Sequence, residues 1–137
     1  MGTRRRAREL ALQLLYQYEL TEGSPEEMQS GFEEWRNSTE VVQTFADGLL
    51  RGTLSYLEEI DEELVRQTTH WRLERLAAVD RNIIRLAMYE LIYEEKTPHA
   101  VVIDEAIEIA KKFGSKDSGR FVNGVLDGFV KRRAKAG

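Results

Sequence analysis

Apolar residues recur at helical spacing along most of the chain. The first stretch shows this clearly, with a single stripe of apolar residues three, four and seven positions apart: Ala7, Leu10, Ala11, Leu14, Leu15 and Tyr18. Such a stripe, at a period of 3.6 residues, indicates an amphipathic helix that buries one face. No segment alternates apolar and polar residues as a half-buried strand would. The pattern therefore predicts an all-α fold.

Capping residues divide this periodic pattern into about seven helices. Ser24 and the polar residues 37–39 are typical N-terminal caps, and Gly114 is expected to end a helix in the left-handed conformation. The expected ranges are 3–20, 24–35, 39–68, 73–79, 80–95 and 98–113, followed by a last helix that begins after Asp117 or Ser118. Gly48 and Gly52 should either bend the third helix or admit a close neighbour.

The length of 137 residues fits one domain made of two packed helical bundles. We place the N-terminal lobe at about 1–68 and the C-terminal lobe at about 69–137. Helix 80–95 is apolar around most of its circumference, so it should be central and buried. Glu90 falls on its core-facing side, seven residues after Ile83, and a buried carboxylate there needs a partner. We expect that partner to be backbone N–H groups at a neighbouring helix start.

Charge is strongly segregated along the chain. Its ends carry eight of the twenty basic residues: Arg4, Arg5, Arg6, Arg8, Lys131, Arg132, Arg133 and Lys135. Residues 9–130 hold the other 12 bases and all 24 acids, which is a net charge of −12 against +4 at each end. A polyanion would therefore be attracted to the ends and repelled by much of the remaining surface.

Composition argues against an enzyme. The chain has no cysteine and two histidines, and it lacks a GxSxG elbow, an HExxH pair and a glycine-rich phosphate loop with its lysine. His70 is interpreted as a packing residue and His99 as an exposed first-turn residue. We expect no catalytic residues, metal or cofactor. There is also no apolar run long enough for a membrane span and no signal peptide, so a cytoplasmic protein without membrane association is expected.

The opening arginines are candidates for binding RNA. Guanidinium groups form forked hydrogen bonds to phosphate, and Arg4, Arg5, Arg6 and Arg8 form an arginine-rich segment without lysine. A helical projection places Tyr16 opposite the apolar stripe and about 20° from Arg5. Its ring could stack an unpaired base, or it could pack against another helix or subunit.

Two residues near the last helix extend this hypothesis. Phe121 lies at the edge of the helix's apolar stripe beside Gly124 and Gly128, a smooth surface that suits a nucleobase, a partner protein or a neighbouring helix. Asp117 could accept a hydrogen bond from a base edge or simply cap the helix. The rival hypothesis for the whole protein is a helical scaffold or dimer whose arginines pair with acids on a neighbouring chain.

Three segments resemble the bacterial NusB family: RRRARELALQLLYQYEL at 4–20, VDRNIIRLAMYELIYE at 79–94 and VIDEAIEIAKKFGSKDSGRFVNGVLD at 102–127. Together they span both lobes, and the FVNGVL sequence after an IDEAIEIAK helix is specific. NusB-like domains also occur attached to certain ribosomal RNA methyltransferases, but no such domain follows here, so a free-standing member is expected.

The resemblance implies a role in transcription antitermination and in ribosomal RNA synthesis and processing. Family members bind single-stranded boxA RNA together with the ribosomal small-subunit protein NusE, as part of the RNA polymerase antitermination complex. It also implies that Arg4, Arg5, Arg6, Arg8, Tyr16, Asp117 and Phe121 match RNA-binding positions, with Asp80 as a further candidate. NusE would dock on the C-terminal lobe, and a homodimer is possible because some members self-associate.

Overall fold

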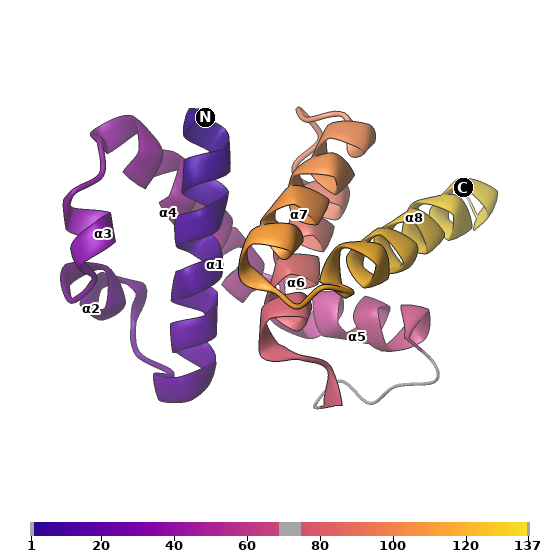
Figure 1. The fold of residues 1–137 in the computed structure, drawn as a ribbon, viewed down its shortest axis with the longest axis horizontal. Helices are drawn as coiled ribbons and strands as arrows, with labels where there is room; N and C mark the ends of the chain where they lie inside the picture. The colour runs from indigo at the N-terminus through magenta and orange to yellow at the C-terminus, as the bar shows by residue number, and fades with distance from the viewer. Residues whose placement is uncertain (1, 69–74, 137) are drawn as a thin grey trace.

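The computed structural model describes residues 2–68 and 75–136 as eight helices (Figure 1). Their bounds are α1 Thr3–Thr21, α2 Pro25–Ser30, α3 Glu33–Arg36, α4 Glu40–Ser55, α5 Leu57–Gln67, α6 Ala78–Tyr93, α7 His99–Phe113 and α8 Ser118–Ala136. These described ranges contain no strand, so the expected all-α fold is confirmed. None of their helices is both long and apolar enough to cross a membrane.

Two helices expected to be continuous are each divided in the structure. The segment 24–35 is interrupted by Gly31 and Phe32, and the extended backbone of Phe32 (φ −104°, ψ 108°) separates α2 from α3. The segment 39–68 is interrupted at Tyr56, whose φ of −113° and ψ of 20° are not helical. This break redirects the chain, so that α5 packs against α6 and α8. Neither break is evident from the sequence, because the apolar spacing continues across both.

The caps of α2 and α4 agree with the sequence pattern. The Ser24 hydroxyl accepts a hydrogen bond from the backbone N–H of Glu27 at 3.1 Å, and the Thr39 hydroxyl accepts one from Val42 at 3.3 Å. Each hydroxyl satisfies a backbone donor that has no partner within the helix. The expected left-handed cap at Gly114 is wrong, because this residue is extended (φ −97°, ψ −165°) and packs closely against the Ser118 side chain.

The short helix expected at 73–79 is absent from the described part of this segment. Residues 73 and 74 lie outside the described part, residues 75–77 are not α-helical, and α6 begins at Ala78. The dividing line between the lobes near residue 69, and His70, also fall in the part of the chain that is not described. The two-lobe division therefore stays a prediction.

Helix α6 is the centre of the molecule, as its apolar circumference predicted. It packs against α1, α4, α5, α7 and α8, and ten of its sixteen residues are buried. On one side α1 packs along α4, and on the other α7 packs along α8 (Figure 1). The position of α6 therefore fixes α1 relative to α7.

The two glycines of α4 have different roles. A Cβ atom at Gly52 would overlap the ring of Tyr89 on α6, so the missing side chain allows close approach between these helices. Gly48 has no neighbouring atom within 4 Å of such a Cβ. The expected close neighbour is thus confirmed at Gly52, whereas Gly48 has none among the described residues.

Candidate nucleic-acid interface

The arginine-rich segment occupies the first turns of α1. The helix begins at Thr3 with no side-chain cap at Gly2 and no acidic residue in its first turn. Cations at this end are repelled by the positive end of the helix dipole, so their placement is unfavourable for the isolated helix. The rest of the fold must compensate for this cost, and it does so with carboxylates from α6 and α7.

Arg5 is held by Glu105 of α7. Its Nε donates to Glu105 Oε1 at 3.0 Å and its NH2 group to Oε2 at 2.5 Å, a forked pair between two helices. The hydrogen bonds from Arg5 lower the pKa of the Glu105 carboxyl below its usual value of 4.5, against the opposing effect of burial. About a third of the Arg5 side chain is still accessible to solvent. Arg5 is thus oriented by the fold and open to a ligand.

Arg8 lies in the interior, which corrects the expectation of four surface arginines. Its Nε and NH2 groups donate to the two carboxylate oxygens of Glu90 at 2.7 and 2.9 Å, and the side chains of the two residues are only 7% and 2% exposed. Glu90 therefore has the partner that its buried position required, but this partner is a guanidinium group and not the expected backbone N–H groups. The pair connects α1 to α6 and makes Arg8 a structural residue.

Arg6 and Arg4 face different surroundings. Arg6 lies 3.4 Å from the carboxylate of Glu9, which is itself buried and also accepts a hydrogen bond from Lys112 of α7 at 3.2 Å. The guanidinium carbon of Arg4 lies over the ring of Phe45 on α4, 4.9 Å from its centroid. The segment thus presents Arg5 and Arg6 toward α7 and Arg4 toward α4.

Lys112 is a cation of this surface that the sequence analysis missed. Its ammonium group reaches Glu9 from α7, and about half of its side chain is exposed. The available signal was its spacing, because Lys112 follows Glu105 by seven residues and so lies on the same face of α7.

The aromatic candidates differ in exposure. Tyr16 is 43% exposed on α1, as expected for the face opposite the apolar stripe. Leu20, one turn further along, is 71% exposed and extends the apolar character of this face. Phe121 at the start of α8 is half-buried and packs against the core. The Tyr16 ring is therefore more accessible to a ligand than the Phe121 ring.

The two acidic candidates lie in opposite settings. Asp117 is exposed immediately before α8, and its carboxylate forms no hydrogen bond with the described residues. Asp80 is buried in the first turn of α6, and its Oδ1 atom has no hydrogen-bond partner within residues 2–68 and 75–136. Asp80 is thus not a surface residue, which corrects its expected position on the RNA surface.

The basic C-terminal end forms a separate region. Arg132 of α8 donates to the Glu63 carboxylate at 2.6 Å and also bonds Gln67, both on α5. Figure 1 shows the two chain ends well apart, with the N-terminus above α1 and the C-terminus at the far end of α8. Among the described residues no group of three or more His, Asp or Glu side chains could hold a metal ion.

Two of these contacts lie along the boundary between α1 and α7. Arg5 and Glu9 of α1 are bonded to Glu105 and Lys112 of α7. Tyr16 lies two turns after Glu9, and Asp117 lies in the turn that precedes α8. The resulting surface carries guanidinium and ammonium groups at one end and an exposed ring further along.

Comparison with known proteins identifies close relatives of this chain. Residues 5–131 match the model of the NusB family. Transcription antitermination protein NusB of Trichlorobacter lovleyi is 46% identical over 127 residues, which cover 93% of this chain and 89% of that protein. The protein of the same name from Desulfitobacterium hafniense strain DCB-2 is also 46% identical, over 131 residues that cover 93% and 88% of the two chains.

Solved structures agree with this result. NusB of T. maritima superposes with a TM-score of 0.82 at 40% identity, over 93% of this chain and 90% of that one. A NusB chain in a crystal structure of the antitermination factors NusB and NusE in complex with dsRNA gives a TM-score of 0.86 at 29% identity, over 96% and 98%. On the family match and the sequence identity, the chain belongs to the NusB family.

Proposed function

We propose that this protein is an RNA-binding transcription antitermination factor. It binds the boxA element of nascent RNA together with the ribosomal protein NusE and supports ribosomal RNA transcription and processing. The observation that carries this proposal is the group of exposed arginines at the start of α1, of which Arg5 is held by the Glu105 carboxylate of α7, on a body of net negative charge. The names of its relatives, and the related structure that contains NusB, NusE and dsRNA, support the same function.

The residues of the proposed RNA-binding surface have different roles. Arg4, Arg5, Arg6 and Lys112 attract phosphates, which supplies affinity that depends on salt but little on sequence. Tyr16 stacks an unpaired base, and Phe121 contributes an apolar edge. Asp117, whose carboxylate has no hydrogen-bond partner among the described residues, accepts a hydrogen bond from a base edge. Arg8 acts indirectly, because its bond to Glu90 fixes the direction in which α1 leaves the core.

Partners and chemistry follow from this assignment. NusE docks on the C-terminal lobe, and the assembly takes part in the RNA polymerase antitermination complex. The protein acts in the cytoplasm as a non-catalytic adaptor that needs no cofactor. The rival is a protein-only scaffold or homodimer in which the same arginines pair with acids of a second chain.

One titration separates the two functions. Fluorescence anisotropy is measured on single-stranded boxA-like RNA, the same RNA as a duplex and a scrambled single strand, each with and without NusE. We expect binding that weakens with salt, preference for the single-stranded boxA-like sequence, and tighter binding when NusE is present. Absence of RNA binding in low salt, together with a concentration-dependent dimer in sedimentation, would establish the rival.

Two single variants then test whether Tyr16 and Arg5 contact the RNA. Tyr16→Ala should reduce the discrimination between boxA-like and scrambled RNA, whereas Arg5→Ala should lower affinity for both and flatten the slope against log salt. If both variants titrate as the parent protein does, the RNA contacts lie elsewhere on the molecule.

A further inference from the structure

A groove lies at the N-terminal end of α1, on the side that faces α4. It separates the first turn of α1 from the first turns of α4 and has a volume of about 530 Å³, within the range of small-ligand sites. Its lining residues are Thr3, Arg4, Glu40, Val41, Thr44 and Phe45. The groove adjoins the arginine-rich segment, but none of its residues other than Arg4 was a candidate from the sequence.

Arg4 is the arginine of the segment that has no carboxylate partner among the described residues. Arg5, Arg6 and Arg8 each approach a glutamate, whereas Arg4 stacks on the ring of Phe45. A guanidinium group held near an aromatic ring by a cation–π contact keeps its N–H groups and its charge available to a ligand. Arg4 and Phe45 therefore place a cation and an aromatic ring side by side in the groove.

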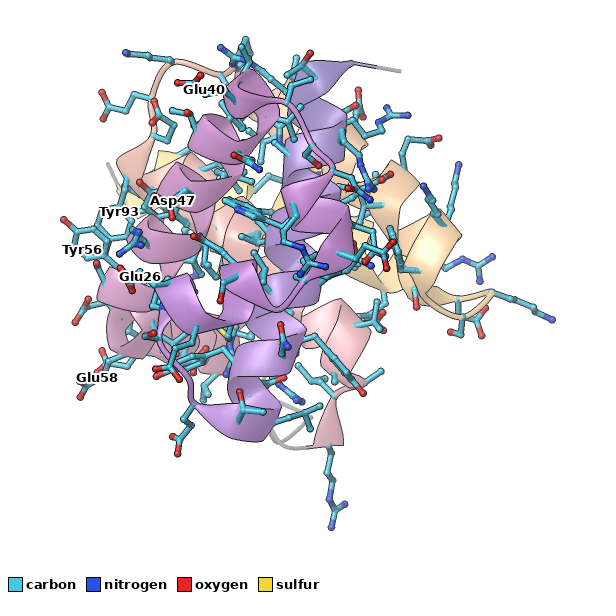
Figure 2. All side chains as sticks on the ribbon, turned by 90° about the vertical axis from the view of Figure 1, so that its left-hand side faces the viewer. Glu26, Glu40, Asp47, Tyr56, Glu58 and Tyr93 are labelled. Carbon is cyan, nitrogen blue, oxygen red and sulfur yellow. The ribbon has the colours of Figure 1, made fainter. Side chains whose placement is uncertain are left out.

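Glu40 lines the same groove without bonding Arg4. It lies in the first turn of α4 at the upper end of the molecule, near the start of α1 (Figure 2). Its carboxylate has no hydrogen bond or ion pair with residues of the described ranges. Two opposite charges thus line one groove without pairing with each other, and both are accessible to an occupant.

The groove also exposes apolar surface. Val41, in the first turn of α4, is 69% exposed. Phe45 is half-buried, and the hydroxyl groups of Thr3 and Thr44 supply further hydrogen-bonding capacity at the rim. An apolar floor with a few polar groups suits a flat heterocycle that has a polar edge.

We propose that this groove binds one unpaired nucleobase of the RNA strand whose phosphates contact the arginine-rich segment. The base stacks on Arg4 beside Phe45 and Val41, and its exocyclic amino group donates to the Glu40 carboxylate. The site therefore favours adenine, cytosine or guanine over uracil. This inference rests on the proposed RNA-binding function and adds a specificity site on the N-terminal side of α1.

Charge distinguishes a nucleotide from an acidic peptide as the occupant. A peptide carboxylate that paired with Arg4 would lie in the same groove as Glu40, and like charges so close together are unfavourable. A nucleotide keeps its anionic phosphate apart from a base edge that carries N–H donors. The phosphate can then remain near the positive end of α1 while the donor edge meets Glu40.

The test combines neutral substitutions with base removal. Anisotropy titrations use a 5′-labelled single-stranded boxA-like RNA and a set of the same RNA in which one nucleotide at a time is made abasic. The variants are Val41→Asn and Phe45→Leu, with Val65→Asn as the matched control because Val65 is 50% exposed on α5. None of these substitutions changes the net charge.

Apart from the base stacked on Tyr16, we expect one further position at which base removal weakens binding to the parent protein by roughly 10-fold, the effect of one stacked base. That penalty should persist in Val65→Asn and fall to about 3-fold or less in both groove variants. At the same position, replacing an amino-bearing base by uracil should weaken RNA binding by the parent protein several-fold. In Glu40→Gln, the two RNAs should bind with equal affinity.

Three results would overturn the inference and leave the proposed function intact. The first is an abasic penalty of the same size in the groove variants and the Val65 control. The second is RNA binding that is unchanged in the groove variants while NusE capture is lost, which would make the groove a protein site. The third is the absence of any base-sensitive position that responds to the groove variants. By contrast, no RNA binding by the parent protein would reject the proposed function itself.

Discussion

Removing one member of the buried Arg8–Glu90 pair should strongly destabilise the protein. Both side chains are less than a tenth exposed and are joined by two hydrogen bonds shorter than 3.0 Å. A buried charge that loses its partner typically costs about 3–5 kcal/mol, because desolvation is no longer offset. A cavity of about 20 Å³ already adjoins the pair, so truncation would add to an existing void. We expect Arg8→Ala to lose about 3–5 kcal/mol of unfolding free energy.

Urea denaturation followed by circular dichroism at 222 nm measures this loss. With an m-value of about 1.5 kcal/mol per molar urea, the midpoint should fall by roughly 2–3 M. Arg5→Ala is the matched control, since its pair with Glu105 is partly solvent-exposed and should contribute at most about 1 kcal/mol. The double variant Arg8→Met with Glu90→Leu should recover most of the stability, because it leaves no unpaired charge.

Two results would refute the reasoning. One is an Arg8→Ala variant as stable as Arg5→Ala, which would mean that the guanidinium group is not needed in the interior. The other is a double variant no more stable than Arg8→Ala, which would mean that the loss comes from packing alone.

Three further predictions test other parts of the fold. Gly52→Ala should lower the free energy of unfolding by about 1–3 kcal/mol because its Cβ would overlap Tyr89. Gly48→Ala on the same helix should raise it by about 0.5–1 kcal/mol. Equal urea midpoints for the two variants would contradict this contrast. Burial raises the pKa of the Glu19 carboxyl, but hydrogen bonds from Arg81, Asn82 and Arg85 outweigh it and hold that pKa below 4.5. The stability that comes from this lowered pKa is present above about pH 4.5 and is lost as the pH falls below it. The urea midpoint of Glu19→Gln should therefore decline less between pH 6 and pH 3 than that of the parent protein. Parallel declines of the two midpoints would exclude this role. Lys112→Gln should reduce the slope of log affinity for RNA against log salt by about one, and an unchanged slope would remove this residue from the phosphate contacts.

The helices were largely predictable because their signals are local. A serine or threonine that caps a helix acts on a backbone group two or three residues away, and an apolar stripe requires only regular spacing. The break at Tyr56 has no such local signal, since residues on both sides keep the same period. What favours the break is the docking of α5 on α6 and α8, which depends on segments distant in sequence.

The surface was predictable only in part, and Arg8 shows why. Its type and neighbours are those of an RNA-binding arginine, yet it precedes Ala11 and Leu15 by three and seven residues and so lies along the apolar stripe. Glu90 was placed on the core-facing side of its own helix by the same argument. Each residue was therefore interpretable as a buried charge, but their pairing depends on how α1 crosses α6. The Arg4–Phe45 stack has the same origin, because it joins residues forty-one positions apart.

The central position of α6 has a consequence for how the molecule melts. Five helices pack against it, so neither flank can lose its structure without exposing apolar surface of this shared element. Calorimetry should therefore record a single cooperative endotherm in which the van't Hoff and calorimetric enthalpies agree. For a protein that would hold RNA on one side and a ribosomal protein on another, such cooperativity means that stabilising either contact stabilises the whole chain.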